Sequence, residues 1–251
     1  MSTLLLKLAA PMQSWGISSK FNRRMTNMEP TRSGVIGMLA AAMGLSREEP
    51  LDMFKSLKFG VRIDQPGTMN RDFQVVYQNP NDTLPAWVTH RYYLEDAVFL
   101  AGLEGPSEFL AELESALTHP VYPLALGRRS CPPAGPLFLG IRDADLLTAL
   151  RQEAWQASSW YQREAKWQHV PSLEIVRDAE PDEDGYAVRD VPESFSQKRR
   201  LYYFRNVIRE QVPLSQIVGS ENTENKQEGY TEHDPMELLE GDDVSIENQN
   251  Q

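Results

Sequence analysis

Residues 11–44 read PMQSWGISSKFNRRMTNMEPTRSGVIGMLAAAMG and join an apolar segment at 3–9 to a run of small and aliphatic residues. Pro30 and Thr31 predict a helix start, because a threonine side chain can accept a hydrogen bond from a free N–H group of the first turn. Gly44 predicts the end of that helix. The stretch therefore predicts a strand, a basic and aromatic loop, and then a helix over residues 31–44.

The first turn of this helix combines two hydroxyl groups with the guanidinium of Arg32. A helix N-terminus with such side chains is suited to phosphate, because its free N–H groups and dipole attract anions. Gly34 and Gly37 lie on one helix face and each costs roughly 1 kcal/mol of helix propensity relative to alanine. They predict a close approach by a sheet or by a ligand backbone. An ordinary capped helix packed tightly in the core is the alternative, and both interpretations stay open.

The composition bounds the class of protein. A chain of 251 residues is long enough for one large domain or two small ones. The apolar start breaks at Lys7, and no apolar segment of membrane length follows. A single cysteine, Cys131, excludes an internal disulfide framework. These features predict a cytoplasmic protein without a membrane partner.

The negative charge is concentrated at the C-terminal end. Residues 220–251 hold 10 of the 36 acidic residues and 1 of the 25 basic residues, so the net charge of −11 falls to −2 for residues 1–219. A body that is nearly neutral can still present a basic face. The polar, acidic composition of 220–251 predicts a disordered tail. One hypothesis is that this tail screens basic surfaces against unrelated nucleic acid.

The order of the predicted elements indicates an α+β fold with a ferredoxin-like core, because it follows the βαββαβ pattern. Residues 72–77 and 87–94 predict a protruding hairpin inserted into this pattern. The last core strand has two candidates, 121–126 and 137–141. The strands and helices expected in order are 3–9, 31–44, 58–64, 97–103 and 105–119.

The C-terminal third is less regular in its pattern. Residues 145–160 predict a helix, and residues 186–191 and 201–209 predict strands. We therefore expect a ferredoxin-like domain over 1–141 with the hairpin at about 71–91. An irregular β-rich C-terminal extension then covers 142–219, followed by the acidic tail at 220–251.

Catalytic chemistry has little support in the sequence. The four histidines are scattered, and neither paired metal-ligand spacing nor a serine nucleophile motif is present. No cofactor or metal is expected. His90 is a candidate general base for RNA cleavage, although a polar or base-stacking hairpin residue is the more common role. Cys131 follows two arginines, which would lower its pKa, but a small buried residue is the alternative.

Binding chemistry has more support, because five short segments mix cations with aromatic, small or hydroxyl residues. Cations hold phosphates while aromatic faces stack on unpaired bases, so such mixtures are typical of proteins that bind single-stranded RNA. Each segment by itself is a weak signal, and their combination on a ferredoxin-like frame favours RNA binding. The segments are 15–24, 32–33, 91–93, 128–130 and 198–209.

Four blocks of the sequence resemble the signature sequences of a known family. They are APMQSWG at 10–16, PTRSGVIG at 30–37, YLEDA at 93–97 and LGRRSCPP at 126–133. In this order they are similar to the CasD family, the RAMP-superfamily subunit of the type I-E CRISPR surveillance complex, Cascade. Pro11 replaces the usual glycine and Arg32 a common lysine, and the acidic tail has no counterpart in the resemblance.

The resemblance implies a subunit that caps one end of the Cascade backbone filament and grips the 5′ handle of the CRISPR RNA in antiviral defence. The hairpin would be a thumb over the guide RNA where the first backbone subunit docks. The large PAM-recognising subunit would be a neighbour. RNA processing in this subtype belongs to another subunit, so the resemblance implies a non-catalytic protein.

We expect specific residues to contact the handle. Gln13, Ser14 and Trp15 would line a pocket for handle nucleotides, and Arg91 and Tyr92 would lie at the thumb base. The other expected RNA-binding residues neutralise phosphates or donate hydrogen bonds, and they are Arg23, Arg24, Arg32, Ser33, Arg128, Arg129 and Ser130.

Two alternatives remain at this point. Some related subtypes use the homologous subunit as the processing endoribonuclease, so metal-independent cleavage of CRISPR repeat RNA with His90 or Tyr92 is the second hypothesis. The third hypothesis is a protein–protein adaptor whose basic segments meet acidic partners.

Overall fold

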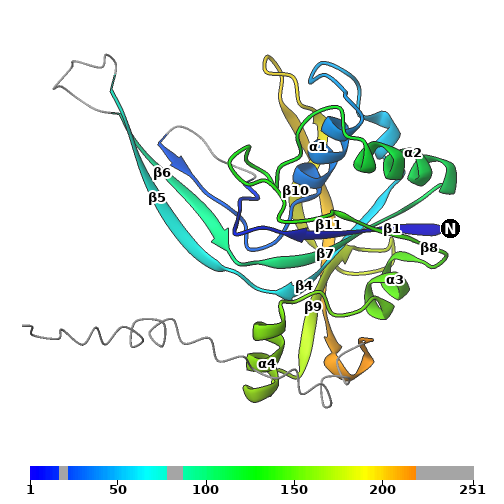
Figure 1. Cartoon of the computed structure of the whole chain (residues 1–251). Coiled ribbons are helices and arrows are strands. Elements are labelled where there is room, and N and C mark those ends of the chain that lie inside the picture. The colour runs from blue at the N-terminus through cyan, green and yellow to red at the C-terminus, as the bar shows by residue number, and fades with distance from the viewer. Residues whose placement is uncertain (17–21, 78–86, 219–251) are drawn as a thin grey trace, which may run out of the picture. The chain divides into compact units, whose positions relative to one another are not determined.

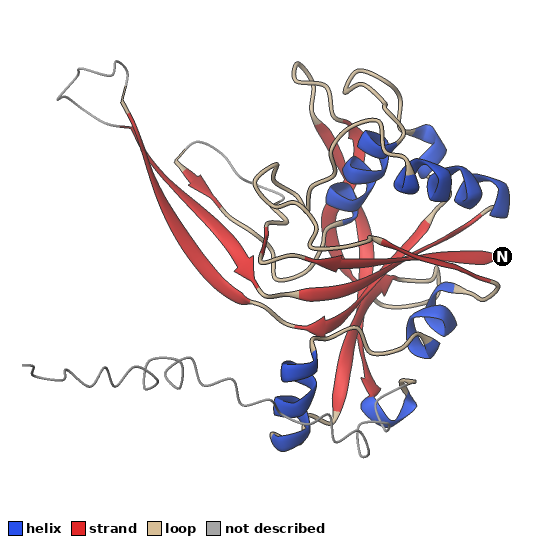
Figure 2. Cartoon of the chain, in the orientation of Figure 1, coloured by secondary structure: helices blue, strands red, loops and turns tan. Residues whose placement is uncertain are grey.

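The apolar N-terminal strand lies inside a seven-stranded sheet with the order β10-β11-β9-β4-β7-β1-β8 (Figures 1 and 2). The computed structural model describes residues 1–16, 22–77 and 87–218. All neighbouring strands of this sheet are antiparallel. The strands are β1 (Ser2–Ala9), β4 (Lys58–Gln65), β7 (Val98–Gly105), β8 (Phe138–Arg142), β9 (Ser172–Asp178), β10 (Tyr186–Ser194) and β11 (Leu201–Pro213).

Both faces of β1 are buried, which explains its nearly continuous leucine sequence. Leu4, Leu6 and Leu8 point to one face, where they pack in a core with helices α1 (Arg32–Ala42) and α2 (Ser107–Thr118). Leu5 points to the other face and packs with α3 (Leu146–Gln152). The strand predicted at 3–9 is therefore confirmed, and helices cover it on both sides.

The chain passes through β1, α1, β4, β7, α2 and β8 in that order. In space these strands lie as β4-β7-β1-β8, so the strands that follow the two helices, β4 and β8, flank β7 and β1. Of the two candidates for the last strand, the segment 137–141 is confirmed, because Phe138–Arg142 pairs with β1. The fold is a sheet-rich α+β fold, as predicted.

The hairpin β5 (Thr68–Val76) and β6 (Trp87–Glu95) continues the central strands β4 and β7 beyond two bends. Gly67 forms one bend, where an added Cβ atom would lie 2.5 Å from the Glu95 carbonyl oxygen. Asp96 forms the other with a φ of 53°. The hairpin extends away from the helices in Figure 1 and carries the short strands β2 (Met12–Gln13) and β3 (Arg23–Arg24) on its other edge. The hairpin is confirmed, and its connection at 78–86 lies outside the described residues.

The C-terminal strands β9, β10 and β11 extend the same sheet from β4. The helix expected over 145–160 is wrong as a single element, because α3 ends at Gln152 and α4 covers Ser159–Trp167. Arg62 explains the break. Its guanidinium donates to the carbonyl oxygens of Leu150, Glu153 and Ala154 at 2.5–2.7 Å, and it holds the chain in a turn after α3.

Two short 3-10 helices complete the described chain, η1 (Asp52–Phe54) and η2 (Leu214–Gln216). Within the described residues, no helix is long and apolar enough to cross a membrane. The predicted tail at 220–251 lies outside the described residues.

Candidate nucleic-acid interface

The base of the hairpin carries a group of polar and cationic residues around Tyr93, which Arg24 joins through its backbone oxygen. We call it the Tyr93 cluster: Arg24, Arg91, Tyr93, Arg128 and Ser130. The guanidinium carbon of Arg128 lies 4.6 Å from the centre of the Tyr93 ring, a cation–π distance. Arg128 Nη2 donates to the backbone oxygen of Arg24 at 2.7 Å. The cluster therefore joins β3, β6 and the loop at 127–131.

The electrostatics of the cluster favour a negatively charged ligand. Burial raises the pKa of Tyr93, but hydrogen bonds from Ser130, Arg128 and Arg91 outweigh that effect and lower this pKa below its usual value. Arg91 Nε and Arg128 Nη1 are buried and have no hydrogen-bond partner among the described residues. Buried donors normally find partners, so these two are suited to an acceptor-rich ligand such as a phosphate.

The loop that carries Arg128 is fixed by one close backbone contact. Gly127 has a φ of 87°, and an added Cβ atom would lie 1.8 Å from the backbone oxygen of Ser14. Only glycine allows this approach. The Leu126 carbonyl also accepts from the Ser14 N–H at 3.1 Å, and the Leu126 N–H donates to the Cys131 carbonyl at 2.7 Å. The loop is therefore a rigid support for the guanidinium.

The opposite face of the hairpin has different chemistry. Successive side chains of a strand alternate between faces, so His90 and Tyr92 point away from Arg91 and Tyr93. His90 pairs in register with Phe73 of β5 and Arg23 of β3, and the His90 and Phe73 rings are 5.6 Å apart. The predicted site residues Arg23 and Tyr92 therefore lie on this second face, outside the Tyr93 cluster.

The side chains of the predicted pocket, Gln13, Ser14 and Trp15, are buried and bind other parts of the chain, so they line no open pocket among the described residues, and their contact with RNA stays a prediction. Gln13 Nε2 donates to the carbonyls of Leu8 and Ala97 at 3.1 and 2.7 Å, and its Oε1 accepts from Trp15 Nε1 at 3.0 Å. Ser14 Oγ donates to the Tyr92 carbonyl at 3.1 Å. Gln13 therefore donates to buried carbonyls where the chain leaves β1, and Ser14 binds the backbone of the hairpin strand β6.

The groups of the predicted phosphate site at the start of α1 bind other parts of the protein in the structure, and their contact with phosphate stays a prediction. The Arg32 N–H donates to the Asp190 carboxylate at 2.8 Å, and Thr31 caps the helix by accepting from Gly34 N at 3.2 Å. The Arg32 guanidinium is 2.8 Å from Asp178 and 2.6 Å from the Leu57 carbonyl. Ser33 is buried as well. The alternative of a capped helix packed in the core is confirmed.

The two glycines of α1 face aromatic side chains instead of a ligand. A Cβ atom added to Gly34 would lie 2.8 Å from Trp15 Cε3, and one added to Gly37 would lie 3.5 Å from the Phe195 ring. A close approach exists at Gly34, whereas the contact at Gly37 is an ordinary van der Waals distance, and neither partner is the predicted sheet or ligand backbone. The partners are the loop before the helix and the hairpin between β10 and β11.

Of the remaining predicted residues, Arg24, Arg91, Arg128 and Ser130 come together in the Tyr93 cluster, and Arg129 is exposed beside it. Tyr93 itself was missing from the predicted site. The alternation of strand residues contains the necessary signal, because Tyr93 shares the face of Arg91 and Tyr92 does not.

Nucleophilic and metal chemistry have little basis among the described residues. Burial raises the pKa of the Cys131 thiol, which is 1% exposed, so the alternative of a small buried residue is confirmed. No group of three His, Cys, Asp or Glu side chains in the described ranges is arranged to hold a metal ion.

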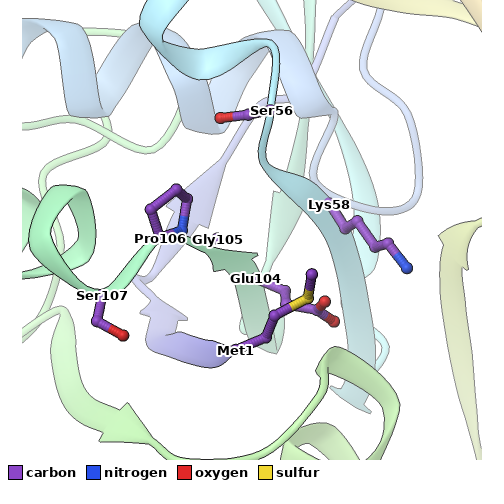
Figure 3. A pocket seen from close by; sticks show the side chains of 7 residues that line it. All are labelled: Met1, Ser56, Lys58, Glu104, Gly105, Pro106 and Ser107. Carbon is purple, nitrogen blue, oxygen red and sulfur yellow. The ribbon is translucent and has the colours of Figure 1, made fainter.

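A pocket of about 440 Å³ lies at the other end of β1 (Figure 3). Its charged residues have partners elsewhere: Lys58 pairs with Glu180, and Glu104 accepts from Leu146 N at 2.8 Å. We assign it no ligand. It is lined by Met1, Ser56, Lys58, Glu104, Gly105, Pro106 and Ser107.

Comparisons with known proteins agree with this geometry. Residues 3–208 match the family described as CRISPR-associated protein (Cas_Cas5). The chain is 37% identical over 161 residues to the CRISPR system Cascade subunit CasD of Escherichia coli (strain K12), which covers 55% of this chain and 70% of that relative.

Two solved structures are similar over most of the chain. A crystal structure of a Cas protein is 35% identical with a TM-score of 0.67, covering 86% of this chain and 97% of the other. A chain of a CRISPR RNA-guided surveillance complex is 33% identical with a TM-score of 0.70, covering 88% and 95%. The match over residues 3–208 and these similarities together show that the chain belongs to the Cas5 family of CRISPR-associated proteins.

Proposed function

We propose that this protein is a non-catalytic subunit of a type I-E Cascade complex that holds the 5′ handle of the CRISPR RNA at the Tyr93 cluster. The observation that carries the proposal is the pair of buried donors, Arg91 Nε and Arg128 Nη1, that have no hydrogen-bond partner in the described part of the chain; the second belongs to the guanidinium stacked on Tyr93. Phosphate and ribose oxygens match such donors, and the salt dependence of RNA binding follows from the cations.

The fold and the relatives support the same proposal. The order β4-β7-β1-β8 with two crossover helices supports the proposal of a ferredoxin-like core, a frame that many RNA-binding modules use. The relative from Escherichia coli is named as a Cascade subunit, and one similar structure comes from an RNA-guided surveillance complex. The Cascade backbone subunit and the large PAM-recognising subunit are the protein partners we propose. The hairpin would serve as the thumb.

The test is a filter-binding titration of the purified full chain with labelled CRISPR repeat RNA. Arg128→Ala/Arg129→Ala should weaken binding and flatten its salt dependence, because it removes two positive charges from the loop. Arg47→Ala/Arg163→Ala is the matched control, since both residues are exposed and outside the ion pairs of the described chain. Unchanged affinity in the loop variant would overturn the proposal.

One observation favours the endoribonuclease alternative. His90 Nδ1 is buried and has no hydrogen-bond partner in the described ranges. A denaturing gel of the same incubations separates the two functions. We expect intact RNA. A discrete product that forms in the presence of a chelator and disappears with His90→Ala would favour cleavage, and assembly with protein partners in the absence of RNA would favour an adaptor.

A further inference from the structure

The ion pairs of the described chain separate its arginines into two groups. In the C-terminal strands, Arg177, Arg205 and Arg209 each contact carboxylates at 3.0 Å or less. These arginines hold the sheet together. No ion pair within the described residues involves the exposed cations of the β10–β11 hairpin, which are Arg189, Lys198, Arg199 and Arg200.

Aromatic side chains accompany these unpaired cations. Phe204 is 67% exposed, and the Arg189 guanidinium carbon lies 6.0 Å from the centre of its ring. Arg189 Nε donates to the Tyr202 carbonyl at 3.1 Å, which holds the guanidinium beside β11. Tyr202 and Phe204 share one strand face. The charge of Arg200 also acts on Tyr202, where it opposes the burial that raises the pKa of this tyrosine.

The β10–β11 hairpin contacts helix α1, and so does the segment that supports the 127–131 loop. Trp15 packs against Gly34 on one side of the helix, and Trp15 follows Ser14, on which the 127–131 loop rests. Phe195 of the β10–β11 hairpin packs against Gly37, and Asp190 of β10 accepts from the first N–H of the helix. The hairpin and the 127–131 loop are therefore both anchored near this helix, and Phe204, which alternates with the Asp190-bound Arg205, lies on the other face of β11.

We propose that the β10–β11 hairpin is a second binding surface for single-stranded RNA, on which cations contact phosphates and Phe204 stacks on an unpaired base. Its residues are Arg189, Lys198, Arg199, Arg200, Tyr202 and Phe204. Unpaired cations beside an exposed aromatic ring match the chemistry of a phosphate chain with unstacked bases. The inference rests on the proposed function, which it extends from one RNA contact to two. The RNA is either a continuation of the strand held at the Tyr93 cluster or a second strand.

The test measures fluorescence anisotropy of labelled single-stranded RNA with the full chain at several salt concentrations. Arg199→Ala/Arg200→Ala should reduce the slope of log K against log salt by about 1.4, since each lost phosphate contact contributes about 0.7. Phe204→Ala should weaken binding by about fivefold or more, and Phe204→Tyr should retain affinity because stacking is preserved. Arg47→Ala/Arg163→Ala removes the same charge from elsewhere and is the matched control.

Two RNA lengths distinguish the sources of the RNA. One compact surface can cover a short RNA of about 10 nucleotides. If Arg199→Ala/Arg200→Ala, the hairpin variant, weakens binding of this short RNA as much as binding of a long RNA, the RNA is a second strand. An effect confined to a long RNA of about 30 nucleotides indicates one continuous strand that reaches both surfaces. A hairpin variant that behaves like the control at both lengths would refute the second surface.

The Arg128→Ala/Arg129→Ala variant separates this inference from the proposed function. If that variant binds normally while the hairpin variant is impaired, the assignment of the Tyr93 cluster fails and the second surface stands. The reverse result retains the Tyr93 cluster and rejects the second surface. A hairpin that binds a protein partner instead would show no change in either RNA titration.

Discussion

Arg32 distinguishes a structural role from an RNA-binding role, because its sequence context suggests phosphate binding and its geometry does not. We consider Arg32→Met, which retains the apolar stem and removes the charge. The guanidinium is nearly buried, with 9% of the side chain exposed. It is 2.6 Å from the Leu57 carbonyl and 2.8 Å from Asp178.

The magnitude follows from the groups that Arg32 leaves behind. The Leu57 carbonyl loses its donor, and an unsatisfied buried acceptor costs roughly 1–3 kcal/mol. Asp178 keeps Arg205 at 2.7 Å and the Phe59 N–H at 2.8 Å, so it is still compensated. An orphaned buried charge costs roughly 3–5 kcal/mol, and this value is therefore an upper limit here. We expect the free energy of unfolding to fall by about 2–4 kcal/mol.

The assay combines unfolding with RNA binding. A loss of about 2–4 kcal/mol corresponds to a melting temperature lower by roughly 4–16 °C for a chain of this size. Arg47→Met, at an exposed position without an ion pair in the described chain, should change stability by less than about 0.5 kcal/mol. RNA affinity of folded Arg32→Met should equal that of the unsubstituted protein. Normal stability together with weak RNA binding would refute the structural role and restore the phosphate site.

Three further predictions follow from particular contacts. Arg62→Met should lower the free energy of unfolding by roughly 3–5 kcal/mol in denaturant titration, because Asp64 is fully buried and Arg62 is the cation paired with it; a loss no larger than that of Arg47→Met would contradict this. Gly127→Ala should displace the 127–131 loop, since its Cβ atom would lie 1.8 Å from the Ser14 carbonyl oxygen. The loss of RNA-binding free energy should exceed the loss of unfolding free energy, and normal affinity would show that the loop adapts. The lowered pKa of Tyr93 places its ionisation below the usual value of about 10, so RNA affinity should fall as the pH rises toward that value, and a Tyr93→Phe protein with the same pH profile would exclude this tyrosine as the source.

Local sequence patterns were sufficient for most of the secondary structure. The cap at Thr31 and the stop at Gly44 predicted α1, and alternating or continuous apolar residues predicted β1, β4 and the hairpin. These signals lie within a few residues of the elements they define, because capping and side-chain periodicity are local effects. The prediction of one helix over 145–160 failed because the contact that ends α3 is not local. It comes from Arg62 of β4, far away in the sequence.

The chemistry of the candidate site was predictable as a set of residue types, but not as a set of exposed residues. The sequence determined that cations, aromatic residues and glycines recur in short segments, and it placed Arg91 and Arg128 in two of them. Whether each cation faces solvent or a carboxylate depends on residues far along the chain. Arg32 meets Asp178 and Asp190, which are more than a hundred positions away. Tertiary packing therefore determined which cations hold the sheet together and which remain available for RNA, because the free energy of a buried charge depends on its distant partners.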